Sequence, residues 1–165
     1  MVQKFEWGHI NINVSDLEAS IEFYKKLGFT PFVPGVPYLN LNAKATAEIP
    51  SASAEALGLA EGTGGRACIM QLGDGFPKID LTELTKGQQR SPQRNDDLGL
   101  VRICLISENL VSAYEALKSQ GIEFVSPPAA CHERLADVAV CRDPDGTLIE
   151  LLQVYLDRWG PFLYE

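Results

Sequence analysis

Four polar side chains stand between apolar neighbours in strand-like runs of this chain, and their types suit proton transfer or ion binding. They are His9, Asp80, Arg102 and Glu150. Because successive side chains of a strand point to opposite faces, each of the four is predicted to turn away from its apolar neighbours, toward one shared interior. A carboxylate beside a guanidinium can serve as a general base, while the cation stabilises a developing negative charge on oxygen. The pattern favours Glu150 as the base, Asp80 as a second carboxylate and Arg102 as the partner of an enolate oxygen.

Uncharged polar residues share this predicted face. They are Asn11, Asn13, Thr82 and Cys104. A purely structural interior favours apolar side chains, because every buried amide or hydroxyl needs a hydrogen-bond partner. The four residues are therefore candidates for substrate binding, and the Cys104 thiol is expected to be inert unless Arg102 lowers its pKa. Glu83 has the opposite parity and is expected on the helix side of its strand.

The elements that would position these residues occur twice along the chain. Each series reads as strand, helix and three further strands, with strands at 9–14, 29–33, 66–72 and 78–84, and again at 101–107, 122–126, 137–141 and 147–153. Gly28 and Gly121 end the two helices, and they are separated by the same distance in sequence as His9 and Arg102 near the two strand starts. Equal spacing of this kind indicates an internal repeat of βαβββ modules. Two such modules are expected to form a curved, cup-shaped sheet with the helices outside.

Side chains that can cap a first turn indicate where the helices begin. Ser15 stands at capping-box spacing from Glu18, and Ser107 with Glu108 opens the second helix. We therefore expect helices directly after the first strand of each module.

A long segment without periodicity interrupts the first module. Residues 35–65 are rich in Pro and Gly around a short Ala-rich stretch at 51–60, which is expected to be a helix capped by Ser51 or Ser53. A connection of this length is more often a functional lid than an idle loop, so the segment is predicted to be mobile and to lie over or beside the site. We expect one domain over residues 1–165, with module one at 5–84, the insert at 35–65, module two at 99–154 and a tail at 155–165.

The composition excludes several classes of partner. The chain has 165 residues, 45% of them hydrophobic, and a net charge of −8, which argues against nucleic acid and anionic membranes. No apolar run reaches the roughly 18 residues of a membrane span, and the N-terminus lacks the apolar core of a signal peptide. The four cysteines have no CxxC spacing, which favours reduced thiols over zinc or disulfides. A cytoplasmic protein with a small-molecule substrate is expected.

Two segments of the chain resemble a known superfamily. HININVSDLEASIEFYKKLGF near the start and RDPDGTLIELLQ near the end are similar to the opening and closing segments of bacterial glyoxalase I and methylmalonyl-CoA epimerase. They place the chain with the vicinal oxygen chelate superfamily, which includes glyoxalases, bleomycin resistance proteins and extradiol dioxygenases. The likeness covers residues 8–34 and 66–154. It implies an α+β fold of paired βαβββ modules and a homodimer, and it makes His132 a further candidate for substrate contact.

The resemblance also implies a metal site in which one position is unusual. In such families four side chains from the first and fourth strands of the modules bind a divalent metal, and His9, Asp80 and Glu150 match three of those positions. One histidine and two carboxylates are adequate ligands for Mn, Fe, Co, Ni or Zn. Arg102 falls on the remaining position, which is usually His, and a guanidinium cannot be a ligand. An Arg–carboxylate cluster in place of the metal is the favoured alternative, and the two-histidine site of an extradiol dioxygenase is disfavoured.

The site chemistry leaves two functions open. The first is an enzyme that moves a proton next to a carbonyl, giving lyase, isomerase or epimerase chemistry with or without a metal. The second is a non-catalytic protein that sequesters an aromatic or anionic small molecule. In that case contacts would come from the insert 35–65 and from the tail aromatics Tyr155, Trp159, Phe162 and Tyr164. Packing of these aromatics on the domain or on a dimer partner is the simpler expectation for them.

Overall fold

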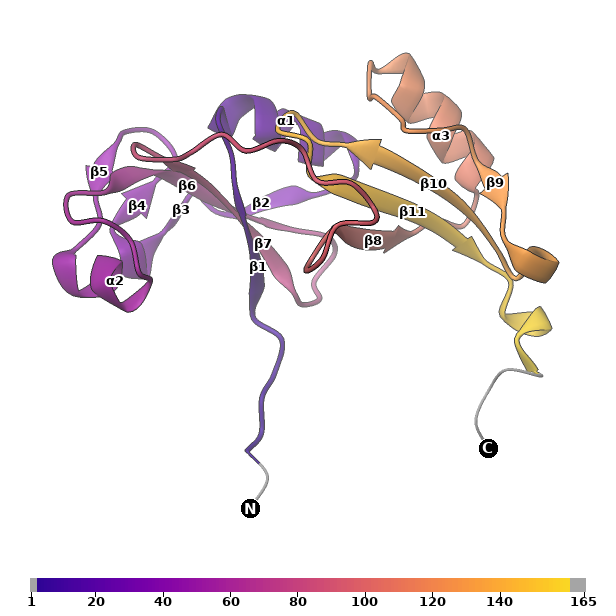
Figure 1. Ribbon diagram of the computed structural model, residues 1–165, viewed down its shortest axis with the longest axis horizontal. Helices are drawn as coiled ribbons and strands as arrows, with labels where there is room; N and C mark the ends of the chain where they lie inside the picture. The colour runs from indigo at the N-terminus through magenta and orange to yellow at the C-terminus, as the bar shows by residue number, and fades with distance from the viewer. Residues whose placement is uncertain (1–2, 161–165) are drawn as a thin grey trace. The chain divides into compact units, whose positions relative to one another are not determined.

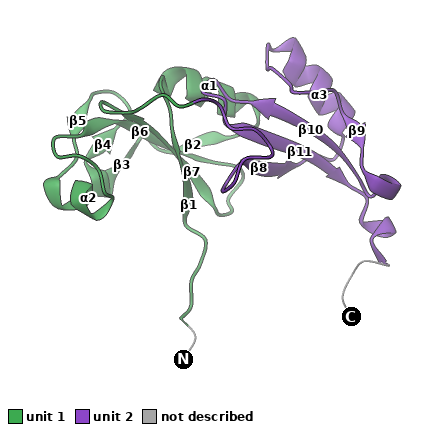
Figure 2. Cartoon of the chain, viewed as in Figure 1, with its two compact units in different colours: residues 1–90 green, residues 91–165 purple. Residues whose placement is uncertain are grey.

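A computed structural model describes residues 3–160 of the chain. The chain divides into two compact units, unit 1 at residues 1–90 and unit 2 at residues 91–165 (Figure 2). Each unit contains one of the two modules expected from the sequence. Within the described residues no helix has the length and apolar character needed to cross a membrane.

Unit 1 contains a sheet with one long helix on one of its faces. Its elements are β1 (His9–Asn13), α1 (Leu17–Lys26), β2 (Thr30–Val33), β6 (Gly64–Gln71) and β7 (Lys78–Leu84), and the strand order is β1-β7-β6-β2 (Figure 1). β1 runs parallel to β7, and the other pairs along this path are antiparallel. Helix α1 packs on β6 and β7, and it buries Leu17 and Tyr24 completely. Because α1 covers one face of the sheet with these large apolar side chains, only the opposite face remains available for other contacts.

Unit 2 repeats the same topology. Its elements are β8 (Arg102–Ile106), α3 (Leu110–Ser119), β9 (Ala129–Ala130), β10 (Ala136–Arg142) and β11 (Leu148–Val154), and the strand order is β8-β11-β10-β9. Short 3₁₀ turns, η2 (His132–Arg134) and η3 (Leu156–Arg158), precede β10 and follow β11. β8 runs parallel to β11, as β1 does to β7. Figure 1 shows α3 lying along one face of this sheet. The mixed α+β fold and the internal repeat expected from the sequence are therefore confirmed.

The two modules hold the start of their helices in the same way. The backbone N–H of Leu17, the first residue of α1, donates to Glu83 Oε2 at 2.8 Å. In unit 2 the N–H of Leu110, the first residue of α3, donates to Gln153 Oε1 at 2.9 Å. The first N–H groups of a helix have no partner within the helix, so a side chain from the last strand supplies one in each module. The expectation that Glu83 faces the helix is confirmed.

The capping residues expected for the three helices are wrong. The helices begin one or two residues later than expected, with Asp16 and Asn109 as the N-caps of α1 and α3. Both Ser15 and Asp16 offer a capping oxygen, and Asp16 Oδ1 accepts the hydrogen bond from the N–H of Ala19 at 2.9 Å. The helix α2 (Ser51–Ala56) has Pro50 at its N-cap, without a serine cap.

The expected strand at 122–126 is reduced to one bridge, between Phe124 and Cys141. Pro127 and Pro128 follow directly, and because proline has no N–H to donate, the ladder cannot continue there. Pairing with β10 resumes only at β9.

The insert 35–65 is a folded layer with a core of its own. It consists of β3 (Gly35–Val36), η1 (Pro37–Leu39), β4 (Leu41–Asn42), β5 (Ala47–Glu48) and α2, with β3 paired to β4 and β5 paired to β6. The apolar side chains buried in it are Val36, Leu39, Leu41, Ile49 and Ala54. They pack with Ala67 and Ile69 of β6. The sequence does not reveal this core, because the apolar residues of the segment follow neither the helix nor the strand period.

The insert packs on the sheet face that α1 leaves free. Arg66 of β6 reaches Glu18 on α1, so the next residue along the strand, Ala67, points to the opposite face. Ala67 and Ile69 are paired across the ladder with Thr82 and Asp80. We call this face of unit 1, turned away from α1, the distal face. The insert therefore covers part of the face that bears Asp80.

Candidate functional site

The distal face of unit 1 brings His9 and Asp80 together. Asp80 lies in the middle of β7 and is almost completely buried, while His9 stands on the neighbouring strand β1 and is partly exposed. The distance from His9 Nε2 to Asp80 Oδ2 is 3.5 Å. The hydroxyl of Tyr38, from η1 of the insert, also lies 3.5 Å from Oδ2. Three side chains from three separate segments thus meet at one carboxylate oxygen.

The other oxygen of Asp80 is buried and lacks a partner. Among the described residues, no group makes a hydrogen bond to Oδ1. Burial raises the pKa of the Asp80 carboxyl, and it outweighs the opposing effects of the His9 charge and the Tyr38 hydrogen bond. A buried acceptor without a partner is costly and uncommon in folded proteins, so this oxygen is a candidate contact for a ligand.

Three of the predicted substrate-binding residues form a hydrogen-bonded row on the same face. Thr82 Oγ1 donates to Asn11 Oδ1 at 2.9 Å, and Asn11 Nδ2 donates to Asn13 Oδ1 at 2.9 Å. Thr82 is buried, whereas both asparagines are exposed. Because both asparagines are exposed, their side chains remain accessible to solvent or to a ligand.

Unit 2 brings Arg102 and Glu150 together on the face of its sheet opposite α3. Gln153 contacts the start of α3, so Glu150, three positions earlier in β11, points to the other face. Arg102 Nε donates to Glu150 Oε2 in an ion pair, and Arg102 Nη1 donates to Asn95 Oδ1 at 3.3 Å. The Glu150 side chain is 15% exposed and that of Arg102 is 39% exposed. The pair therefore has a largely desolvated carboxylate and a cation that reaches solvent.

Cys104 lies directly opposite Glu150 in the β8–β11 register. Desolvation raises the pKa of the Cys104 thiol, and the charge of Glu150 raises it further. The lowering effect of Arg102 is smaller than these two, so the pKa of the thiol is raised overall. Cys104 therefore adjoins the Arg102–Glu150 pair, and its contact with substrate stays a prediction.

His132 and the tail lie at the surface of unit 2. His132 is in η2, largely exposed, and 3.5 Å from the adjacent Glu133, so its contact with substrate stays a prediction. The Tyr155 hydroxyl donates to Asp137 at 2.8 Å, and the Trp159 indole donates to Leu135 O at 3.0 Å. These two aromatics pack on unit 2 itself. Phe162 and Tyr164 lie outside the described residues.

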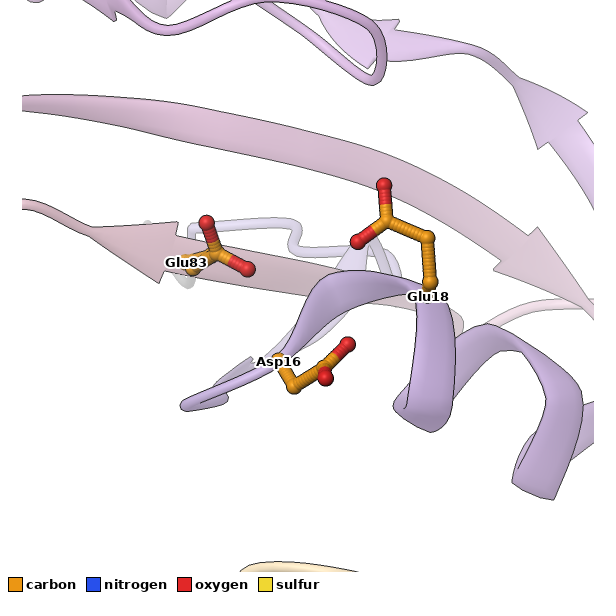
Figure 3. Close-up of side chains that lie close together, drawn as sticks. All are labelled: Asp16, Glu18 and Glu83. Atoms are coloured by element: carbon orange, nitrogen blue, oxygen red, sulfur yellow. The ribbon is translucent and has the colours of Figure 1, made fainter.

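A third group of acidic residues surrounds the start of α1. Oxygens of Asp16, Glu18 and Glu83 lie within 4.8 Å of one another, close enough in principle to hold a metal ion (Figure 3). Each carboxylate already has partners, because Asp16 caps the helix and Arg66 forms ion pairs with both glutamates. The hydrogen bond from Arg66 lowers the pKa of Glu18, and the pKa of Arg66 is raised in return. The guanidinium of Arg66 thus supplies the positive charge that a metal ion would otherwise bring to this group.

Two residues beside the site were missed from the sequence. Tyr38 lies in the aperiodic insert, where no spacing connects it to Asp80. Lys78 has the parity of Asp80 and is buried, with its ammonium 4.6 Å from the Phe32 ring centre and 4.7 Å from that of Phe76. Its Nζ donates to Gln71 Oε1 at 2.9 Å, which leaves this charge satisfied within unit 1.

The fold described above agrees with the comparisons to known proteins. A family model, the Glyoxalase/Bleomycin resistance protein/Dioxygenase superfamily, matches residues 7–151. The chain belongs to this superfamily. A lactoylglutathione lyase of Pseudomonas aeruginosa is 27% identical over 165 residues, which covers 95% of this chain and 87% of that protein.

Solved structures show the same fold. A glyoxalase family protein from Bacillus cereus matches with a TM-score of 0.71 at 18% identity, covering 93% of this chain and 96% of that one. The trypanothione-dependent glyoxalase I of Leishmania major matches with a TM-score of 0.58 at 18% identity, covering 91% and 87%.

The donors that the structure offers fit a divalent metal only in part. In unit 1, His9 Nε2 and the unpartnered Asp80 Oδ1 have the right chemistry for one. In unit 2 the carboxylate of Glu150 is occupied by a permanent cation, which would repel a metal ion. Within residues 3–160, these two donors of unit 1 are fewer than the three protein ligands of catalytic zinc sites. We therefore derive no reaction step through a metal.

Proposed function

We propose that this protein is a glyoxalase-like enzyme that transfers a proton between adjacent carbons of a small oxygenated substrate, in lyase or isomerase chemistry. The observation that carries the proposal is the Arg102–Glu150 pair. It combines a desolvated carboxylate that can accept a proton with a cation that can stabilise the resulting enolate. The likeness to a lactoylglutathione lyase supports a hemithioacetal of a 2-oxoaldehyde and glutathione as the first substrate to test.

The proposed reaction is an isomerisation without net oxidation. Glu150 takes the proton from the carbon that bears the hydroxyl and the sulfur, and the electron pair moves onto the neighbouring carbonyl oxygen. Arg102 stabilises the negative charge on that oxygen through its Nη groups, since its Nε is directed at Glu150. The proton then returns to the adjacent carbon, while the hydroxyl proton of the first carbon passes to the oxygen that carried the negative charge, and a 2-hydroxy thioester results. Asp80 is proposed as a second carboxylate that binds a substrate hydroxyl.

The test is the conversion of methylglyoxal and glutathione, followed by the ultraviolet absorbance of the thioester. Glu150→Gln should lower kcat by roughly 10²–10⁴-fold, because it removes the base and keeps the size of the side chain. Glu115→Gln is the matched control, since Glu115 is an exposed residue of α3 in the same unit, and its kcat should be unchanged. Wild-type turnover that Glu150→Gln does not reduce would refute the assigned role.

A binding protein is the alternative that the same experiment separates. Tight binding of the thioester without turnover by the wild type would favour sequestration over catalysis. We also propose that the protein forms a homodimer, as its family resemblance implies, and light scattering after size-exclusion chromatography measures this directly.

A further inference from the structure

The backbone of the insert holds Tyr38 at a fixed place beside the distal face. Pro37 begins η1 and sets its own φ, and Asn40 closes the turn in the left-handed conformation with φ 58°. The N–H of Asn40 donates to Pro37 O at 3.0 Å, and its Nδ2 donates to Glu48 O at 3.1 Å. On either side of this turn, Val36 and Leu39 are buried in the insert core. The turn is therefore anchored at both ends.

The side chain of Tyr38 does not join that core. The residue is 58% exposed, although five apolar side chains of the insert are buried. Its hydroxyl instead lies at Asp80 Oδ2, and its ring centre is 6.5 Å from that of His9. A tyrosine needed only for packing would bury its ring, because that is where its stabilising contribution arises. The position of Tyr38 is explained better by its polar end than by its ring.

The contact with Tyr38 gives the two oxygens of Asp80 different environments. Oδ2 faces the hydroxyl of Tyr38 and the imidazole of His9, whereas Oδ1 is buried and has no hydrogen-bond partner in the part of the chain that is described. Across the ladder β6 presents the apolar Ile69 to Asp80. On its own strand, the ammonium of Lys78 is directed at Gln71. The carboxylate is thus held through one oxygen, and the second is left as a buried acceptor.

We propose that Tyr38 is a positioning residue for substrate binding, and that the insert is therefore part of the site. By donating to Oδ2 it orients the Asp80 carboxylate so that Oδ1 accepts a hydrogen bond from a hydroxyl of the substrate. The ligand class is a small molecule with a hydroxyl next to an oxygenated carbon. This inference rests on the proposed function for the identity of the substrate, but the contact between Tyr38 and Asp80 can be tested without turnover.

The kinetic test is a double-mutant cycle of Tyr38→Phe and Asp80→Asn with methylglyoxal and glutathione. Tyr38→Phe should raise KM about fivefold, as expected for loss of one hydrogen bond, and should leave kcat within about twofold. In the Asp80→Asn background the same change should alter KM by less than about twofold, because the orienting contact no longer has its carboxylate. A purely structural role of Tyr38 would give equal losses in both backgrounds and would overturn the proposal.

The second measurement does not depend on activity. In protein labelled at tyrosine Cζ, the carbon resonance of Tyr38 should move on Asp80→Asn and on addition of S-lactoylglutathione. The resonance of Tyr114, whose hydroxyl contacts Lys118 Nζ at 3.1 Å in unit 2, is the matched control and should stay in place in the Asp80→Asn variant. If the wild type makes no thioester but Tyr38 responds to Asp80→Asn, the proposed function fails and the positioning contact stands. No response of Tyr38 to Asp80→Asn overturns the contact itself.

Discussion

Replacing Arg102 by glutamine tests the ion pair on which the proposed chemistry depends. The change removes the positive charge and leaves Glu150, whose side chain is 15% exposed, without its counter-ion. Exposed ion pairs contribute about 0–1 kcal/mol to stability, and breaking a fully buried pair costs about 3–5 kcal/mol. Because Arg102 itself is 39% exposed, the cost should lie between these limits. We expect Arg102→Gln to lower the free energy of unfolding by about 1.5 kcal/mol.

The assay is urea unfolding followed by circular dichroism at neutral pH and low salt. Arg102→Gln, Glu150→Gln and the double variant form a cycle, and the double variant should recover about 1 kcal/mol of the sum of the single losses. Arg94→Gln is the control, because Arg94 forms an exposed ion pair with Asp96 at 3.0 Å in the same unit. Its effect should stay within about 0.5 kcal/mol.

A coupling between Arg102 and Glu150 below about 0.3 kcal/mol would refute the reasoning. In that case the two side chains would not share a desolvated environment, and Glu150 would lose its assigned place as a base held by a cation. A changed dependence on urea concentration in the single variants would instead indicate an altered unfolded or native state, so equal slopes are required for the comparison.

Further predictions concern the metal, the buried carboxylate and the insert. Arg102→His supplies the missing ligand type, so titration calorimetry should detect Mn²⁺ or Ni²⁺ binding that is much weaker in the wild type; equal affinities would contradict the ion-pair account. The pKa of Asp80 is raised in the folded protein, so its ionisation reduces stability as the pH rises from its unfolded-state pKa toward the folded one. Asp80→Asn should therefore raise Tm by about 2–4 °C at neutral pH and by less in acid, as measured by calorimetry. Ile49→Ala, in the insert core, should cost about 2–5 kcal/mol in urea unfolding, whereas an effect below about 1 kcal/mol would mean that the insert folds separately from the sheet.

The strand alternation in the sequence predicts which face the paired residues share, in His9–Asp80 and in Arg102–Glu150, but not the other side chains that contact them. The parity of Asp80 and Glu150 follows from their apolar neighbours, and the structure places both on the faces turned away from the helices. The role of Tyr38 could not be predicted, because it depends on a contact between an aperiodic insert and a strand far along the chain. Convergence of all four polar residues on one interior stays a prediction.

Local competition between similar residues explains the smaller errors. Ser15 and Asp16 both carry capping oxygens, and the sequence alone does not say which one reaches the first turn. The run at 122–126 alternates like a strand, but the two prolines that follow it have no N–H to donate to a ladder. In both cases the type of element follows from the sequence, and a neighbouring residue determines where the element begins or ends.

The two modules bind the first backbone N–H of their helices with different kinds of side chain. The first N–H of α1 is held by the charged Glu83, which also requires Arg66, whereas the first N–H of α3 is held by the neutral amide of Gln153. Dissolved ions weaken contacts between charges and have little effect on contacts between neutral groups. The start of α1 therefore becomes less firmly held as ionic strength rises, while the start of α3 does not, so two modules of the same topology respond differently to the salt concentration around them.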